Sequence, residues 1–181
     1  MTMMGLGVAI RRLLHDREGV AAIEFALLAP LLLALLMGTV TLFDLFRASQ
    51  NVEKATFTAG DILSRQSTIN AAYLQSTFST VTTLVGGDAT QISMRVSSIK
   101  RTLSTYSVDW SKVTGKAVPL LTTSTIPTGR IPDIADGDSV LVIDTFVPHS
   151  AIFSIAGFNA ITFNSMSAYR PRFTSSIAYV N

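Results

Sequence analysis

The pattern of hydrophobic and polar positions begins with one long apolar run. Residues 20–43 read VAAIEFALLAPLLLALLMGTVTLF and carry a single charge, that of Glu24. At about 1.5 Å per residue, a helix of this length is roughly 36 Å long, more than the roughly 30 Å hydrocarbon core of a bilayer. The run therefore predicts one transmembrane helix. Membrane helices tolerate proline, so Pro30 is expected to kink this helix near residues 26–30 without breaking it.

The pattern then changes to a helical period and is predicted to stay helical from residue 44 to about residue 84. Apolar positions recur at intervals of three and four residues, which is typical of one buried helix face. Gly60 weakens this segment, and Gly86-Gly87-Asp88 is expected to end it. The stripe consists of Val52, Ala55, Ala59, Ile62, Gln66, Ile69 and Tyr73.

From residue 90 onward the period falls to two, which indicates half-buried antiparallel strands. Residues 140–143 instead form a continuous apolar run, typical of a central strand, and residues 119–138 are a loop rich in proline and threonine. The predicted fold class is α+β: a long N-terminal transmembrane and amphipathic helix followed by a small antiparallel β-sheet, with the helix covering one face. The alternating apolar positions are Ile92, Met94 and Val96, then Tyr106, Val108 and Trp110, and later Ile161 and Phe163.

Charge and composition narrow the function classes. The net charge is only +2, and no dense Lys/Arg stripe accompanies it, so nucleic-acid binding is not expected. The chain has no cysteine, which excludes disulfides, thiolate catalysis and Cys-ligated metals. Arg11, Arg12 and Arg17 precede the apolar run, whereas Arg47 and Lys54 follow it. This bias favours a cytoplasmic N-terminus, with residues 44–181 outside.

Two polar clusters are weak candidates for chemistry. Asp133, Asp136 and Asp138 are possible calcium ligands, but their spacing does not fit an EF-hand loop, and a solvated turn is the favoured interpretation. His149 is followed by Ser150 and lies near Asp144 in sequence, but a catalytic triad requires convergence in space. A surface or edge histidine is therefore expected.

Three other features have structural interpretations. Trp110 is expected in the core or on the sheet face. Arg170 and Arg172 flank Pro171 and are expected to place charge on an edge strand, which discourages edge-to-edge aggregation. With no nucleophile, metal or phosphate motif present, neither an enzyme nor a cofactor is predicted.

The start of the apolar run resembles a known processing site. Gly19, four small or apolar residues, then Glu24 and Phe25 before a long apolar helix are similar to the G-x-x-x-x-E-F site of pilins and pseudopilins in the Tad (tight adherence) branch of type IV pili. The stretch EGVAAIEFALLAPLLLALLMG resembles the TadE-like pilus assembly proteins, and SMSAYRPRF at residues 165–173 resembles the close of that family's last strand. Phe25 stands where major pilins often carry tyrosine, which favours the TadE-like minor class.

The resemblance implies a processed, pilin-like protein. A membrane-embedded prepilin peptidase would cut after Gly19, so residues 1–19 would be a leader and Val20 the new N-terminus. The mature chain would then comprise a transmembrane helix (20–43), an extracytoplasmic helical continuation (44–88) and an extracytoplasmic antiparallel β domain (89–181). It would be a minor pilin or pseudopilin of the inner membrane or the filament. Its partners would be the peptidase, other pilin subunits, the inner-membrane assembly platform and the lipid bilayer.

Physical chemistry links the cut to the glutamate. Glycine lets an extended backbone enter a tight protease site, and cleavage would give Val20 an α-amine with a pKa near 7.7–8.0. An unpaired carboxylate at the bilayer centre costs about 2.5–3.5 kcal/mol, which a nearby amine would offset. Glu24, with Phe25, is therefore a candidate for docking pilin helices in register. The alternatives are a carboxylate that snorkels to the membrane edge, an unprocessed single-pass scaffold or binding protein, and, with little support, a membrane-anchored enzyme.

Overall fold

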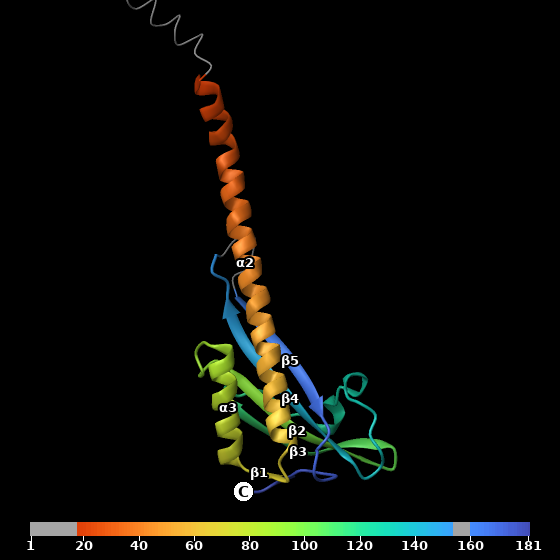
Figure 1. Ribbon diagram of the computed structural model, residues 1–181. Coiled ribbons are helices and arrows are strands. Elements are labelled where there is room, and N and C mark those ends of the chain that lie inside the picture. The colour runs from red at the N-terminus through yellow and green to blue at the C-terminus, as the bar shows by residue number, and fades with distance from the viewer. Residues whose placement is uncertain (1–17, 154–159) are drawn as a thin grey trace, which may run out of the picture. The chain divides into compact units, whose positions relative to one another are not determined.

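The computed structural model describes residues 18–153 and 160–181, and the chain divides into two units, 1–42 and 43–181. The first described element is helix α2, Glu18–Ser64 (Figure 1). Pro30 lies inside this helix and does not break it. The predicted leader falls almost entirely on residues 1–17, which lie outside the described residues.

The prediction of an unbroken helix to about residue 84 is wrong. Helix α2 ends at Ser64, and a two-residue strand β1 (Thr68–Ile69) precedes a second helix, α3 (Ala71–Val85). The side chain of Asn70 starts α3 by accepting a hydrogen bond of 2.8 Å from the backbone N–H of Tyr73. The sequence pattern missed this break because the apolar spacing continues through it.

The break changes what the predicted stripe contacts. Val52, Ala55 and Ala59 are buried on α2 as expected, but the next buried apolar side chain is that of Leu63, whereas Ile62 is only half-buried. Ile69 is also buried, but as part of β1, which pairs in parallel with β6 (Ala178–Tyr179). Helix α3 ends where predicted, at Gly86, whose φ of +70° lies in the left-handed region that favours glycine.

The remaining strands form one antiparallel sheet, which confirms the α+β class. The sheet has the order β3-β2-β4-β5, so the apolar run at residues 140–143 does belong to an interior strand. Figure 1 shows α3 and the distal part of α2 running across the sheet. The strands are β2 (Ser93–Thr102), β3 (Thr105–Gly115), β4 (Ser139–Ser150) and β5 (Ala160–Tyr169).

The two interior strands are buried on both faces: the continuous apolar run of β4 indicated this, whereas β2 was predicted to be only half-buried. Leu141 and Ile143 pack on the helix side with Met94 and Val96, together with residues from α2 and α3. Val140 and Val142 point the other way and pack with Ile99. The cover on this second face is the proline- and threonine-rich loop, which contributes Leu121 and Ile134 and contains the short helices η1 (Thr123–Thr125) and η2 (Thr128–Arg130).

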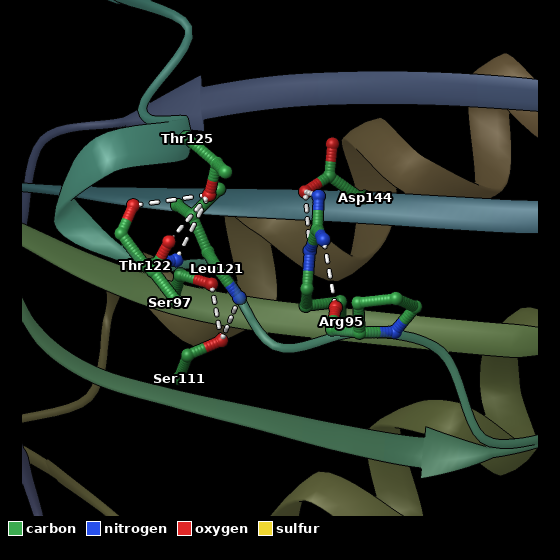
Figure 2. Close-up of polar contacts among 8 residues, drawn as sticks. Arg95, Ser97, Ser111, Leu121, Thr122, Thr125 and Asp144 are labelled. Carbon is green, nitrogen blue, oxygen red and sulfur yellow. Dashed lines mark hydrogen bonds and ion pairs between the residues drawn. The ribbon is translucent and has the colours of Figure 1, made fainter.

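Polar contacts fasten this loop to the sheet (Figure 2). Arg95 on β2 donates to Asp144 on β4, with N···O distances of 2.8 and 3.0 Å, and donates to the carbonyl of Pro119 at 2.9 Å. The hydroxyl of Ser111 accepts a hydrogen bond of 3.1 Å from the backbone N–H of Leu121. Because Asp144 is almost fully buried, this ion pair holds the start of the loop against the second face.

Trp110 packs on a face of the sheet as expected, but a bulge in β3 corrects the predicted alternation of Tyr106, Val108 and Trp110 on one face. The register shifts between Ser98 and Ile99, which pair with Trp110 and Val108, so Asp109 is the extra residue. Val108 therefore packs toward the loop-covered face and Trp110 toward the helix-covered face, although two residues normally separate positions on one face. The indole N–H of Trp110 donates to the carbonyl of Ile177 at 2.8 Å, which ties the C-terminal segment to the sheet.

Candidate membrane anchor and processing site

The first half of α2 exposes apolar side chains on all its sides. Phe25 and Leu31 are 66% and 63% exposed, and the strongly apolar window of this helix has none of its residues buried inside the protein. Within the described part of the chain, α2 is the one helix that is long and apolar enough to cross a membrane. Water is a poor solvent for such a surface, whereas hydrocarbon is a good one. The other exposed apolar residues here are Val20, Ile23, Leu27, Leu28, Leu32, Leu33, Leu35 and Leu36.

Gly19 and Val20 lie in the first turn of α2. Both are exposed, and a Cβ at Gly19 would meet no atom within 4 Å. The described part of α2 starts at Glu18, so the bond after Gly19 lies in helical backbone, whereas a protease site takes an extended one.

Glu24 lies one turn beyond Val20 on the same face of α2, and Phe25 follows it. Its side chain is exposed among apolar neighbours, and no ion pair within residues 18–153 and 160–181 involves it. A carboxylate in such surroundings is stable in a membrane only with a partner or with access to water. The described part of the chain supplies no such partner.

His149 contacts a residue that is distant from it in the sequence. Its Nε2 lies 2.8 Å from Oδ2 of Asp44, which is the first residue after the apolar run. Asp144, which lies near His149 in sequence, accepts from Arg95 and takes no part in this contact. The half-buried histidine thus joins the end of β4 to α2, a contact that the expectation of a surface or edge histidine did not include.

A cavity of about 420 Å³ adjoins this contact, and no pattern in the sequence indicated it. Its walls come from three segments that are distant in sequence: α2, the end of α3, and strands β4 and β5. The cavity combines charged, polar and apolar groups. The lining residues are Asp44, Arg47, Ala48, Asn51 and Val52; Val85, Gly86 and Gly87; Val147, Pro148, His149 and Ser150; and Phe163.

The three aspartates of residues 133–138 are engaged by arginines. Arg101 binds Asp133, and its Nε lies 3.2 Å from Asp136, while Arg170 lies 3.7 Å from Asp138. Among the described residues, no group of three or more His, Cys, Asp or Glu side chains is placed to hold a metal ion. The carboxylates therefore act as partners of cations within the protein.

The arginines that follow β5 bind acidic side chains of neighbouring segments. β5 is an edge strand that ends at Tyr169. Arg172 binds Asp61 on α2, just as Arg170 faces Asp138 ahead of β4. These two arginines therefore tie the end of the sheet to its surroundings in addition to placing charge near its edge.

Comparison with known proteins gives one match. Residues 19–61 match the sequence model of the TadE-like protein family. No curated protein and no solved structure matches the chain. The matched segment starts at Gly19 and covers the exposed apolar half of α2 and most of the half that packs on the sheet, which confirms the resemblance seen in the sequence.

Proposed function

We propose that this TadE-like protein is a minor pilin or pseudopilin that takes part in the assembly or initiation of a Tad-type pilus. The observation that carries the proposal is the family match over residues 19–61, which coincides with a helix that is apolar and exposed in its first half. The protein acts by assembly with other subunits and not by catalysis. The inner-membrane assembly platform is its docking partner.

In this proposal a prepilin peptidase cuts after Gly19. The absence of a side chain at Gly19 and the exposure of both Gly19 and Val20 leave the peptide bond accessible where the backbone unwinds locally. The leader stays on the cytoplasmic side, the apolar half of α2 spans the inner membrane, and residues 44–181 lie outside.

The cut creates the partner that Glu24 lacks. The new α-amine of Val20 lies one helical turn from Glu24 in the same chain, and the amine of a neighbouring subunit reaches Glu24 when the two helices are in register. A neighbouring helix out of register leaves a charged group unpaired in hydrocarbon, which costs about 2.5–3.5 kcal/mol of free energy near the bilayer centre. Glu24 and the exposed ring of Phe25 next to it thus select the axial register of pilin helices.

N-terminal sequencing of the protein extracted from membranes tests the cut. The expected first residue is Val20, and Gly19→Val is expected to leave the chain uncut because its branched side chain crowds the protease site. Gly38→Val changes a glycine of the same exposed helix half and is expected to be cut normally. A wild-type chain that starts at Met1 or Met3 would reject processing and favour an unprocessed single-pass scaffold.

Glu24→Gln tests the docking role separately. The variant should be cut at Gly19 but should lose pilus formation and co-purification with other pilin subunits. Glu53→Gln, which removes a carboxylate from an exposed position beyond the apolar half of the same helix, is the matched control. Normal piliation with Glu24→Gln would show that the carboxylate is only a snorkelling group.

A further inference from the structure

The cavity beside Asp44 and His149 is lined on one side by residues of α2 that directly follow the apolar run. Counting about 1.5 Å per residue from Phe43, Asp44 lies about 1.5 Å and Arg47 about 6 Å further along the helix. The headgroup layer on each side of a bilayer is roughly 5–8 Å thick. With residues 20–43 in the membrane, as the proposed function requires, this wall of the cavity is therefore at headgroup depth.

The apolar surface near the cavity agrees with that position. Phe43 and Phe46 are 66% and 63% exposed on α2, and Ile152, which follows the cavity-lining Ser150, is 60% exposed. The contact between His149 and Asp44 holds the end of β4 to this part of α2, so these apolar groups belong to one end of the second unit. Exposed apolar side chains at the edge of a polar cavity are typical of contact with a membrane surface.

The cavity offers opposite charges to a ligand. Arg47 forms no ion pair with any described residue, and its guanidinium is suited to phosphate recognition, with the amide of Asn51 one turn away. On the other wall, α3 ends at Val85 and Gly86, and its last turn carries no basic residue. The C-terminal carbonyls of a helix carry a partial negative charge that favours a cation.

The cavity walls also include apolar side chains, which would contact the carbon atoms of a ligand that carries both charges. Val52 and Val147 are buried and Phe163 is half-buried, so they give the cavity an apolar lining beside its polar groups. A volume of about 420 Å³ falls in the range of small-molecule sites, roughly 300–1,000 Å³. A ligand with a phosphate, a nearby ammonium and a short apolar stem would use all of these features.

We propose that this cavity binds the zwitterionic headgroup of a membrane phospholipid, with its phosphate at Arg47 and Asn51 and its primary ammonium near Asp44 and the C-terminal end of α3. The bound lipid fixes the second unit at the membrane surface. Because the inference rests on the membrane anchor of the proposed function, its test must report on the anchor separately.

The experiment titrates the full chain, purified in mild detergent, with phosphatidylethanolamine and counts bound lipids by native mass spectrometry. Arg47→Gln is expected to weaken the first lipid about tenfold, since it removes one charge-assisted contact. Lys54→Gln is the matched control: it removes one exposed cation from the same helix two turns further on, outside the cavity, and should bind like the wild type.

A second variant tests whether lipid binding depends on the cavity itself and not only on the positive charge of Arg47. Ala48→Phe leaves every charge in place but fills the cavity, and it should also weaken the first lipid. Thermal unfolding of both variants should match that of the wild type, because position 47 is exposed and position 48 lines open space.

Three outcomes would overturn the inference itself, and a fourth would overturn the proposed function on which it rests. Equal lipid binding by Arg47→Gln or Ala48→Phe and the wild type would remove the cavity from the interaction. Equal binding of phosphatidylglycerol would remove the ammonium contact. If soluble glycerophosphoethanolamine bound as tightly as the lipid, the ligand would not need to come from a membrane. A chain that carbonate washes from membranes would show instead that the anchor of the proposed function has failed.

Discussion

The two halves of helix α2 place their apolar side chains in opposite surroundings. Leu31 is 63% exposed, whereas Leu63, in the last turn of the same helix, is fully buried. The first half is apolar around its whole circumference, and the second half is apolar only along the stripe that packs on the sheet. A helix that is apolar all round needs an apolar solvent, whereas a striped helix needs a folded partner.

In both halves of α2, threonine hydroxyls donate hydrogen bonds to backbone carbonyls one turn earlier in the helix. The hydroxyls of Thr39 and Thr41 donate to the carbonyls of Leu35 and Met37, each at 2.8 Å. Thr56, on the packed half, donates to the carbonyl of Val52 at 2.7 Å. A hydroxyl bonded within its own helix needs no water, so the same device serves in hydrocarbon and in a protein core. The halves therefore differ in side-chain surroundings and not in helix construction.

The largest expected difference between the halves concerns leucine. Leu63→Ala leaves a cavity in the main core and should lower the free energy of unfolding of the second unit by about 2–5 kcal/mol. Leu31→Ala should change it by less than about 0.5 kcal/mol, because no described part of the protein packs on that side chain. Chemical denaturation in detergent, followed by tryptophan fluorescence from Trp110, measures both. Equal losses would show that the exposed half also packs on the protein.

Replacing glycine in each half of α2 is expected to give a smaller difference in stability. The ring of Tyr169 lies so close to Gly60 that a Cβ there would overlap it, whereas a Cβ at Gly38 would meet nothing within 4 Å. Gly60→Ala should therefore destabilise the second unit by about 1–3 kcal/mol despite the better helix propensity of alanine. Gly38→Ala is the control and should be neutral for that unit. If Gly60→Ala is stabilising, the helix and β5 are not in the tight contact that the structure shows.

The smallest expected effect concerns one hydrogen bond and its dependence on pH. The hydroxyl of Tyr169 donates to the carbonyl of Phe57 at 3.1 Å, and Tyr169→Phe should cost about 0.5–1.5 kcal/mol. Burial, with a further contribution from the negative charge of Asp61, raises the pKa of Tyr169 above its usual value near 10.

The sign of the pH effect follows from that shift. The folded state disfavours the phenolate, so the stabilisation is fully present below pH 10 and is lost as the pH rises through the raised pKa. Urea denaturation at pH 8 and at increasing pH above 10 should therefore show a smaller stability difference between the wild type and Tyr169→Phe at the higher pH. A difference that does not change with pH would assign the whole effect to packing.

Local signals explain what could be predicted from the sequence. The apolar run needs no partner to be recognised, because its composition alone sets its preferred solvent. Gly86 ended α3 because a left-handed residue stops a helix, and the run at residues 140–143 marked an interior strand because both of its faces are apolar. The family resemblance at residues 18–38 is likewise a local pattern.

The errors arose where a distant segment decides the outcome. The break after Ser64 is completed by β6, more than a hundred residues later, which pairs with β1. The direction of Trp110 depends on a bulge, and a two-residue period cannot show a bulge in advance. The expected solvated turn at Asp133 and Asp136 is present, but its pairing with Arg101, which the sequence could not indicate, depends on the loop folding back over the sheet.

The sequence by itself therefore determined the apolar run, the order of the helical and strand regions, and the candidate site at Gly19 and Glu24, since each of these depends on residues within a few helical turns of one another. Only the tertiary structure decided that both faces of the sheet are covered, and that Asp44 and His149 meet beside a cavity. Those two residues are separated by 105 positions. Their contact results from the packing of β4 on α2, because side chains so distant along a chain meet only where the fold brings their backbones together.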